Sequence, residues 1–126
     1  MIGYVTVGTN DLEKASAFYD ALLGEIGAQR AMDMETFKAW SNGGEAMFSV
    51  IKPFDGEAAT VGNGVMAAIA APDHATVDKL YAKAIELGGT DEGEPGMRGG
   101  DGSGFYAAYF RDLDGNKLNF FHFKQS

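Results

Sequence analysis

Tyr106–Phe121, YAAYFRDLDGNKLNFF, contains two runs of aromatic and aliphatic residues that are separated by a polar turn. The turn, Asp114–Asn116, is rich in the residues that supply positive φ angles in tight hairpins. The stretch therefore predicts an antiparallel hairpin, made by Phe105–Arg111 and Lys117–Phe123, at the end of the fold.

The composition is that of one compact domain. At 126 residues the chain is long enough to bury a core, and it has no cysteine for disulfides or metal ligation. No apolar run long enough to span a membrane and no secretory signal is visible, so we expect a cytoplasmic protein. The net charge of −8 comes from scattered acids, which argues against nucleic-acid and membrane partners.

The first half has the pattern of one strand, one helix and three further strands. Leu12, Phe18 and Leu22 recur at helical spacing between a capping Asp11 and a terminating Gly24. Short β-branched or aromatic runs around this helix predict strands at Ile2–Val7, Ile26–Ala31, Thr36–Trp40 and Ala46–Ile51.

The second half repeats this order. A strand of small residues, Val65–Ala71, precedes a helix that starts after Asp73 and ends at Gly88. Thr90–Glu94 predicts a short strand, and Pro95–Gly104 predicts a glycine-rich loop before the terminal hairpin.

A shift of 62 residues superposes the two halves, placing Asp11 on Asp73 and Tyr19 on Tyr81. We interpret residues 1–126 as a single α+β domain of two tandem βαβββ modules, at about 1–52 and 65–126, joined by a linker at about 53–64. Each module is expected to form a curved mixed sheet with a helix on its outer face. The two concave faces are expected to enclose a cleft.

Three stretches together resemble a known family: Val5–Gly24, Met66–Asp73 and Arg111–Leu118. Their order and spacing are similar to those of the vicinal oxygen chelate superfamily, which includes glyoxalase I, extradiol dioxygenases, and bleomycin- and fosfomycin-resistance proteins. The resemblance spans nearly the whole chain and implies a glyoxalase-like fold. It also implies a homodimer, since relatives commonly pair about a two-fold axis.

Metalloenzymes of this superfamily hold a divalent ion with His, Glu or Gln at four strand positions. The resemblance places Tyr4, Met66 and Asn119 at three of these positions, and Ser49, or Met47 in another register, at the fourth. Neutral oxygen and thioether groups do not form a Zn, Ni or Fe site, which needs imidazole and carboxylate ligands. We therefore expect no metal and no other cofactor.

The remaining candidates each have two interpretations. Arg98, in the expected loop, either binds an anionic group of a ligand or is an ordinary surface residue. The strand aromatics Trp40, Tyr106 and Phe121 either line the cleft or pack in the core. The two histidines, His74 and His122, lie outside the metal positions.

The sequence thus predicts a metal-free protein that binds an unidentified planar or apolar small molecule in its cleft, as resistance proteins of this superfamily do. One alternative is an enzyme, either a glyoxalase-type lyase or isomerase or a dioxygenase-like protein. Another is a structural or regulatory dimer with a vestigial cleft. No catalytic residue is identified. The predicted ligand-binding residues are Tyr4, Trp40, Ser49, Met66, Arg98, Tyr106, Asn119 and Phe121.

Overall fold

The computed structural model describes residues 1–100 and 102–124 of the chain. The chain forms two compact units, Met1–Gly62 and Asn63–Ser126, which we call the first and second modules. Neither helix in the described part of the chain is long and apolar enough to cross a membrane.

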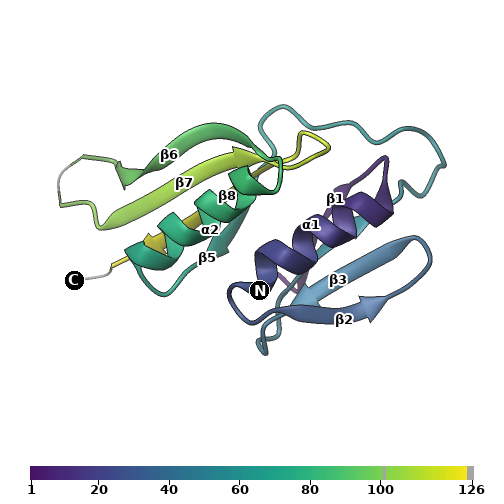
Figure 1. The fold of residues 1–126 in the computed structure, drawn as a ribbon, viewed down its shortest axis with the longest axis horizontal. Helices are drawn as coiled ribbons and strands as arrows, with labels where there is room; N and C mark the ends of the chain where they lie inside the picture. Colours follow the sequence, from purple (N-terminus) through teal and green to yellow (C-terminus); the bar gives the residue numbers. More distant parts are fainter. Residues whose placement is uncertain (101, 125–126) are drawn as a thin grey trace. The chain divides into compact units, whose positions relative to one another are not determined.

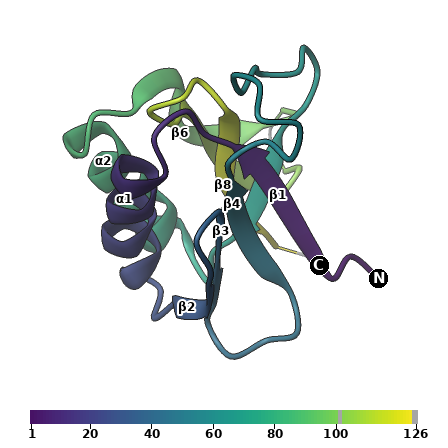
Figure 2. The same cartoon turned by 90° about the vertical axis from the view of Figure 1, so that its right-hand side faces the viewer.

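The first module contains one helix and a four-stranded sheet (Figure 1), formed by β1 (Tyr4–Gly8), α1 (Leu12–Gly24), β2 (Gln29–Asp33), β3 (Phe37–Ser41) and β4 (Met47–Ile51). The strand order is β1-β4-β3-β2, with β1 parallel to β4 and the other neighbours antiparallel. Figure 2 shows α1 against one face of this sheet.

Helix α1 begins where the Asp11 carboxylate accepts a hydrogen bond from the backbone N–H of Lys14, at 3.1 Å. Its apolar side packs on the sheet, with the Tyr19 ring 5.7 Å from the Trp40 ring and 4.7 Å from the Phe48 ring. These three side chains are buried, so the core of the first module lies between α1 and the sheet.

The second module has the same organisation, formed by β5 (Ala67–Ala70), α2 (His74–Glu86), β6 (Thr90–Arg98), β7 (Phe105–Arg111) and β8 (Lys117–Phe123). The strand order is β5-β8-β7-β6, with β5 parallel to β8. Strands β7 and β8 pair antiparallel through a turn in which Gly115 has a φ of 88°, so the predicted terminal hairpin is confirmed.

The two modules repeat one βαβββ unit. Helices α1 and α2 each have 13 residues, and α2 begins and ends 62 residues after α1. The cap repeats too, because Asp73 accepts a hydrogen bond from the backbone N–H of Thr76 at 2.8 Å. The predicted α+β class with two βαβββ modules is therefore confirmed.

Strand β6 is longer than the sequence indicated. It runs to Arg98, so the expected loop at Pro95–Gly104 is wrong for its first four residues. Strand β6 lies at the edge of the sheet, where it pairs with β7 and its register shifts on either side of Gly93. An edge strand tolerates proline because the missing N–H faces away from the ladder. Asp101, also part of the expected loop, lies outside the described residues.

Candidate functional site

Each sheet has one face covered by its own helix and an opposite face, which we call the helix-free face. In the first module Trp40 and Phe48 point toward α1. Side chains alternate along a strand, so Ser49 lies on the helix-free face. Its hydroxyl oxygen is 2.7 Å from that of Thr6, the residue opposite it on β1. Tyr4, two residues before Thr6, shares this face and makes a T-shaped contact with the Phe37 ring, at 6.4 Å between centroids.

In the second module the helix-free face is set by the alternation along β7 and β8. Phe110 and Phe120 stack at 5.2 Å on the helix side and are fully buried. Tyr109 and Asn119, which are paired across these strands, therefore lie on the helix-free face. Phe121 lies on the same face, where its ring stacks on Phe105 at 5.7 Å.

Asn119 has an unusual environment for an amide. Its side chain is only 1% exposed. Its Oδ1 atom is buried and has no hydrogen-bond partner among the described residues. A buried carbonyl oxygen without a donor costs about 1–3 kcal/mol. Such a group in a native protein needs a physical explanation.

The strand register shows which residue of the first module is equivalent to Asn119 under the internal repeat. Ser49 lies opposite Thr6 on β1, and Asn119 lies opposite Ala68 on β5. Thr6 and Ala68 are themselves equivalent under the 62-residue repeat. Ser49 is therefore the counterpart of Asn119 in the first module, and Met47 is not.

The residues at the four superfamily positions do not fit a divalent metal ion. Tyr4 and Ser49 lie on the helix-free face of the first module. In the second module Met66 immediately precedes β5 and Asn119 is in β8. Zn²⁺, Ni²⁺ and Fe²⁺ favour imidazole, thiolate or carboxylate ligands, and none of these four side chains supplies one. Residues 1–100 and 102–124 also contain no cluster of three His, Cys, Asp or Glu residues suited to a metal.

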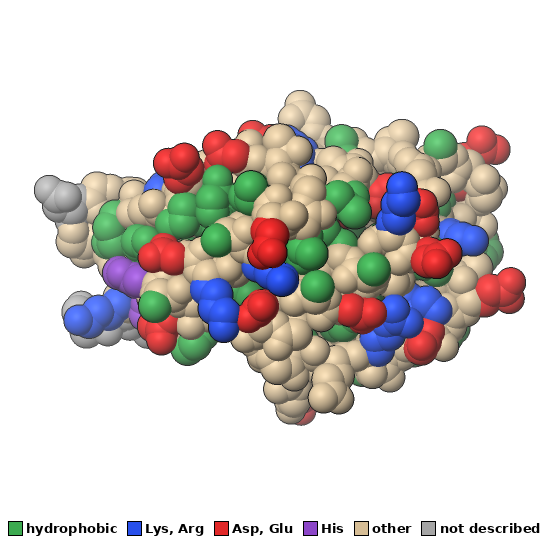
Figure 3. Space-filling view, in the orientation of Figure 1, with side chains coloured by type: hydrophobic (Ala, Val, Ile, Leu, Met, Phe, Trp, Pro, Cys, Tyr) green, Lys and Arg blue, Asp and Glu red, His purple; other side chains and the backbone are tan. Residues whose placement is uncertain are grey.

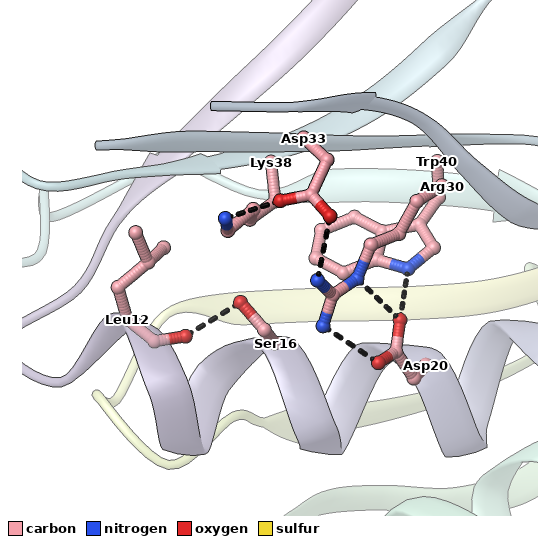
Figure 4. Close-up of polar contacts among 7 residues, drawn as sticks. All are labelled: Leu12, Ser16, Asp20, Arg30, Asp33, Lys38 and Trp40. Carbon is pink, nitrogen blue, oxygen red and sulfur yellow. Dashed lines mark hydrogen bonds and ion pairs between the residues drawn. The ribbon is translucent and has the colours of Figure 1, made fainter. Parts of the chain in front are cut away.

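Trp40 lies in the core of the first module and not on its helix-free face, where the predicted cleft would be. It is 2% exposed and lies on the helix side, where its indole Nε1–H donates to Asp20 of α1 at 2.9 Å (Figure 4). Arg30 of β2 forms a bidentate pair with the same carboxylate. Partial burial raises the pKa of Asp20, but the hydrogen bonds from Arg30 and Trp40 outweigh it and hold the pKa below its usual value. These hydrogen bonds connect α1 to strands β2 and β3 of the sheet.

Tyr106 is also on the helix side, so its predicted place in the cleft is wrong. Its ring stacks on His74 of α2, with centroids 4.0 Å apart, and its hydroxyl donates to Asp78 at 2.5 Å. The bond to Asp78 and then partial burial raise the pKa of Tyr106. His122 lies on the same side, with Nδ1 3.1 Å from the Ala71 carbonyl oxygen.

Arg98 is at the end of β6, and its side chain folds back along its own strand. The guanidinium carbon lies 5.4 Å from the centre of the Tyr109 ring, and Nη2 donates to the Glu94 carbonyl at 2.6 Å. Gly93 and Gly96 leave room for the Arg98 side chain. A Cβ atom added at Gly93 would lie 3.2 Å from the Arg98 Nη2 atom, and one added at Gly96 would lie 2.9 Å from the Arg98 Nη1 atom.

Lys117 lies beside Tyr109, and the sequence pattern did not single it out. Its Nζ atom lies 5.6 Å from the centre of the Tyr109 ring. Lys117 precedes Asn119 by two residues in the same strand, so it lies on the same face. That spacing, with the turn fixing the start of β8, was the available sequence signal.

A second feature is a hollow of about 490 Å³ in the first module. Its charges balance, since three basic residues, Arg30, Lys38 and Lys52, face three acidic ones, Asp11, Glu13 and Glu35. Arg30 and Lys38 are already paired with Asp33. Figure 3 likewise shows acidic and basic side chains interspersed on the face that it draws. The hollow therefore has no charge preference that would define a ligand.

Several solved structures have a fold similar to that of this chain. A glyoxalase/bleomycin resistance protein from Albidiferax ferrireducens T118 is 37% identical, with a TM-score of 0.87 over 97% of this chain and 98% of that chain. A hypothetical protein from S. aureus is 27% identical, with a TM-score of 0.74 over 97% and 92%. A lactoylglutathione lyase from Agrobacterium tumefaciens shares the fold at 20% identity, with a TM-score of 0.70 over 97% and 92%.

A comparison with curated protein sequences found no match. A family profile, however, matches nearly the whole chain, at residues 1–120. This match agrees with the repeated βαβββ modules and with the 37% identical structure from A. ferrireducens. The chain therefore belongs to the Glyoxalase/Bleomycin resistance protein/Dioxygenase superfamily.

Proposed function

We propose that the protein binds a small organic molecule without a metal ion, on the helix-free face of a module. The observation that carries this proposal is the set of side chains at the four superfamily metal positions, Tyr4, Ser49, Met66 and Asn119. They are a phenol, a hydroxyl, a thioether and an amide rather than metal ligands; Tyr4 and Met66 are exposed for contact with an organic ligand, whereas Ser49 and Asn119 are buried.

The surroundings of these positions support an organic ligand. Tyr4 is 59% exposed and Met66 is 42% exposed, which leaves large side chains available for contact. Phe121 and Tyr109 add aromatic surface in the second module. Apolar lining with a few polar groups is typical of small-molecule sites.

The test is a thermal-shift screen of the metal-stripped protein against a panel of metabolites and antibiotics. A ligand present at about 100 times its Kd should stabilise the protein by about 2.7 kcal/mol, and adding EDTA should not change this. If stabilisation instead requires an added divalent ion, the proposal is wrong and a metal-dependent enzyme becomes the better account.

A matched pair of variants tests the position of the ligand. Ala68 is exposed on β5 opposite Asn119, so Ala68→Trp should fill the helix-free face and abolish the shift. Ala82 is exposed on α2, so Ala82→Trp should keep the shift. Equal loss, or equal retention, of binding in the two variants would contradict the proposed location.

A further inference from the structure

We infer that Asn63, in the segment that joins the two modules, is a site of spontaneous deamidation. The boundary between the modules falls between Gly62 and Asn63, and strand β5 begins at Ala67. Residues 61–66 are all exposed, so water reaches the Asn63 side chain. This modification is independent of the proposed ligand, because it needs only the chain and water.

The reaction takes place between two neighbouring residues. The backbone nitrogen of Gly64 attacks the side-chain carbonyl carbon of Asn63, a new C–N bond forms, and the bond to the side-chain nitrogen breaks. Ammonia leaves with the proton of the Gly64 nitrogen, and a five-membered succinimide remains. Water then opens this ring. Cleavage at the former side-chain carbonyl gives aspartate, and cleavage at the backbone carbonyl of Asn63 gives isoaspartate.

The sequence offers two positions for this reaction. Asparagine is one of the thermally labile residues. Two of the five asparagines of the chain, Asn42 and Asn63, precede a glycine. A following glycine favours ring closure, because it has no Cβ atom to obstruct the attack and its backbone is conformationally free. The other three, Asn10, Asn116 and Asn119, precede residues with side chains.

Hydrogen bonds distinguish the two Asn-Gly pairs. The Gly43 N–H donates to the Ser41 Oγ atom at 3.2 Å, so this nitrogen must lose a hydrogen bond before it attacks Asn42. The Gly64 N–H and the Asn63 side-chain amide have no hydrogen-bond partner in residues 1–100 and 102–124. The two reacting groups at Asn63 are therefore free to meet, whereas the nitrogen that would attack Asn42 is held.

Deamidation at Asn63 changes the connection between the modules. Upstream, the Asn10 side chain holds the backbone of Ala59 through two hydrogen bonds, at 3.2 Å and 2.7 Å. The reaction adds one negative charge to a chain whose net charge is −8. The isoaspartate product also leads the main chain through the former side chain, which inserts one carbon atom between Gly62 and Gly64.

The test follows the purified full chain by peptide mapping with mass spectrometry, which locates aspartate and isoaspartate at each asparagine. The chain is incubated in buffer and, in parallel, in concentrated urea, where unfolding removes the structural difference between the two pairs. Relative to the rates in urea, we expect the folded chain to deamidate at Asn63 about two to ten times faster than at Asn42. One hydrogen bond of ordinary strength supplies a ratio of about this size.

Two variants test the cause of this difference. Ser41→Ala removes the acceptor of the Gly43 N–H, so it should raise the rate at Asn42 toward that at Asn63 and leave Asn63 unchanged. Asn63→Gln should stop the reaction at this position, because glutamine would have to close a larger ring, and should leave Asn42 at its wild-type rate. Asn63 is exposed, so this variant should keep the wild-type melting temperature.

Three outcomes decide the inference. Selective deamidation at Asn63, with the selectivity lost in Ser41→Ala, supports it. If Asn63 stays unmodified in the folded chain while it deamidates in urea, the inference is wrong. It is also wrong if Asn42 reacts as fast as Asn63 in the folded chain, relative to urea.

Discussion

Asn119 is a buried amide whose oxygen carries a stability cost at the scale of one residue. The superfamily resemblance places a carboxylate of metalloenzymes at this position, whereas here a neutral amide is buried and its oxygen has no partner in residues 1–100 and 102–124. A residue retained for packing alone would not bring a polar oxygen into a site where nothing donates to it. Asn116, in contrast, is buried with its amide donating to Asp112 at 3.0 Å, so it stabilises the turn before β8.

The same substitution, Asn to Leu, should have different effects on stability at Asn119 and at Asn116. Asn119→Leu removes an unpaired buried oxygen, so it should leave the free energy of unfolding unchanged or raise it by about 1 kcal/mol. Asn116→Leu breaks a satisfied buried group and should lower that free energy by about 1–3 kcal/mol. Urea unfolding of both variants measures the difference. A larger loss in Asn119→Leu than in Asn116→Leu would show that the Asn119 amide is structural.

At the scale of elements, hydrogen bonds join each helix to an edge of its sheet. In the first module, Asp20 of α1 binds Arg30 of β2. In the second module, the Tyr81 hydroxyl of α2 donates to Asp91 of β6 at 2.8 Å. Partial burial and then the bond to Asp91 raise the pKa of Tyr81 from 10.0 to about 12.

This raised pKa predicts a loss of stability in alkali. Between pH 10 and about 12 the unfolded chain loses the Tyr81 proton while the folded chain keeps it, so stability falls as the pH rises. Tyr81→Phe should lose about 1 kcal/mol at pH 7 and fall less steeply over that alkaline range. Chemical unfolding at several pH values measures both effects. An alkaline fall as steep as that of the wild type would contradict the assignment.

The helices and strands also differ in how well the sequence predicts them. Both helices were predictable because capping aspartates, apolar spacing and terminating glycines agree locally. The end of β6 was not, because Pro95 and Gly96 indicate a loop and only pairing with β7 makes this segment a strand. Asn119 and Ser49 were placed by the family pattern, and the register agrees with that choice.

Trp40 and Tyr106 were misplaced for one reason. Each lies in a strand whose two faces both carry apolar residues, so the sequence does not tell which face meets the helix. The partners that settle the question, Asp20 and Asp78, come from the helices and are distant in sequence.

At the scale of the whole molecule, open sheet edges bear on assembly. Strands β1, β2, β5 and β6 each end a four-stranded sheet. Unpaired edges favour association with another chain, and cyclic dimers are the commonest closed assembly. We expect a homodimer, so light scattering at micromolar concentration should give about twice the 13.4 kDa monomer mass. A mass near that of the monomer would contradict this expectation.

With Tyr4, Ser49, Met66 and Asn119 at the superfamily metal positions, we expect this protein to work without a metal ion. Removing water from a divalent ion to bind it with neutral oxygen and thioether groups does not repay the cost of dehydration. Elemental analysis of protein purified from metal-supplemented medium tests this most directly. We predict no stoichiometric Zn, Ni, Fe or Mn, and a melting temperature unchanged by a chelator. About one tightly held equivalent per chain, lost on substituting these four residues, would contradict the claim.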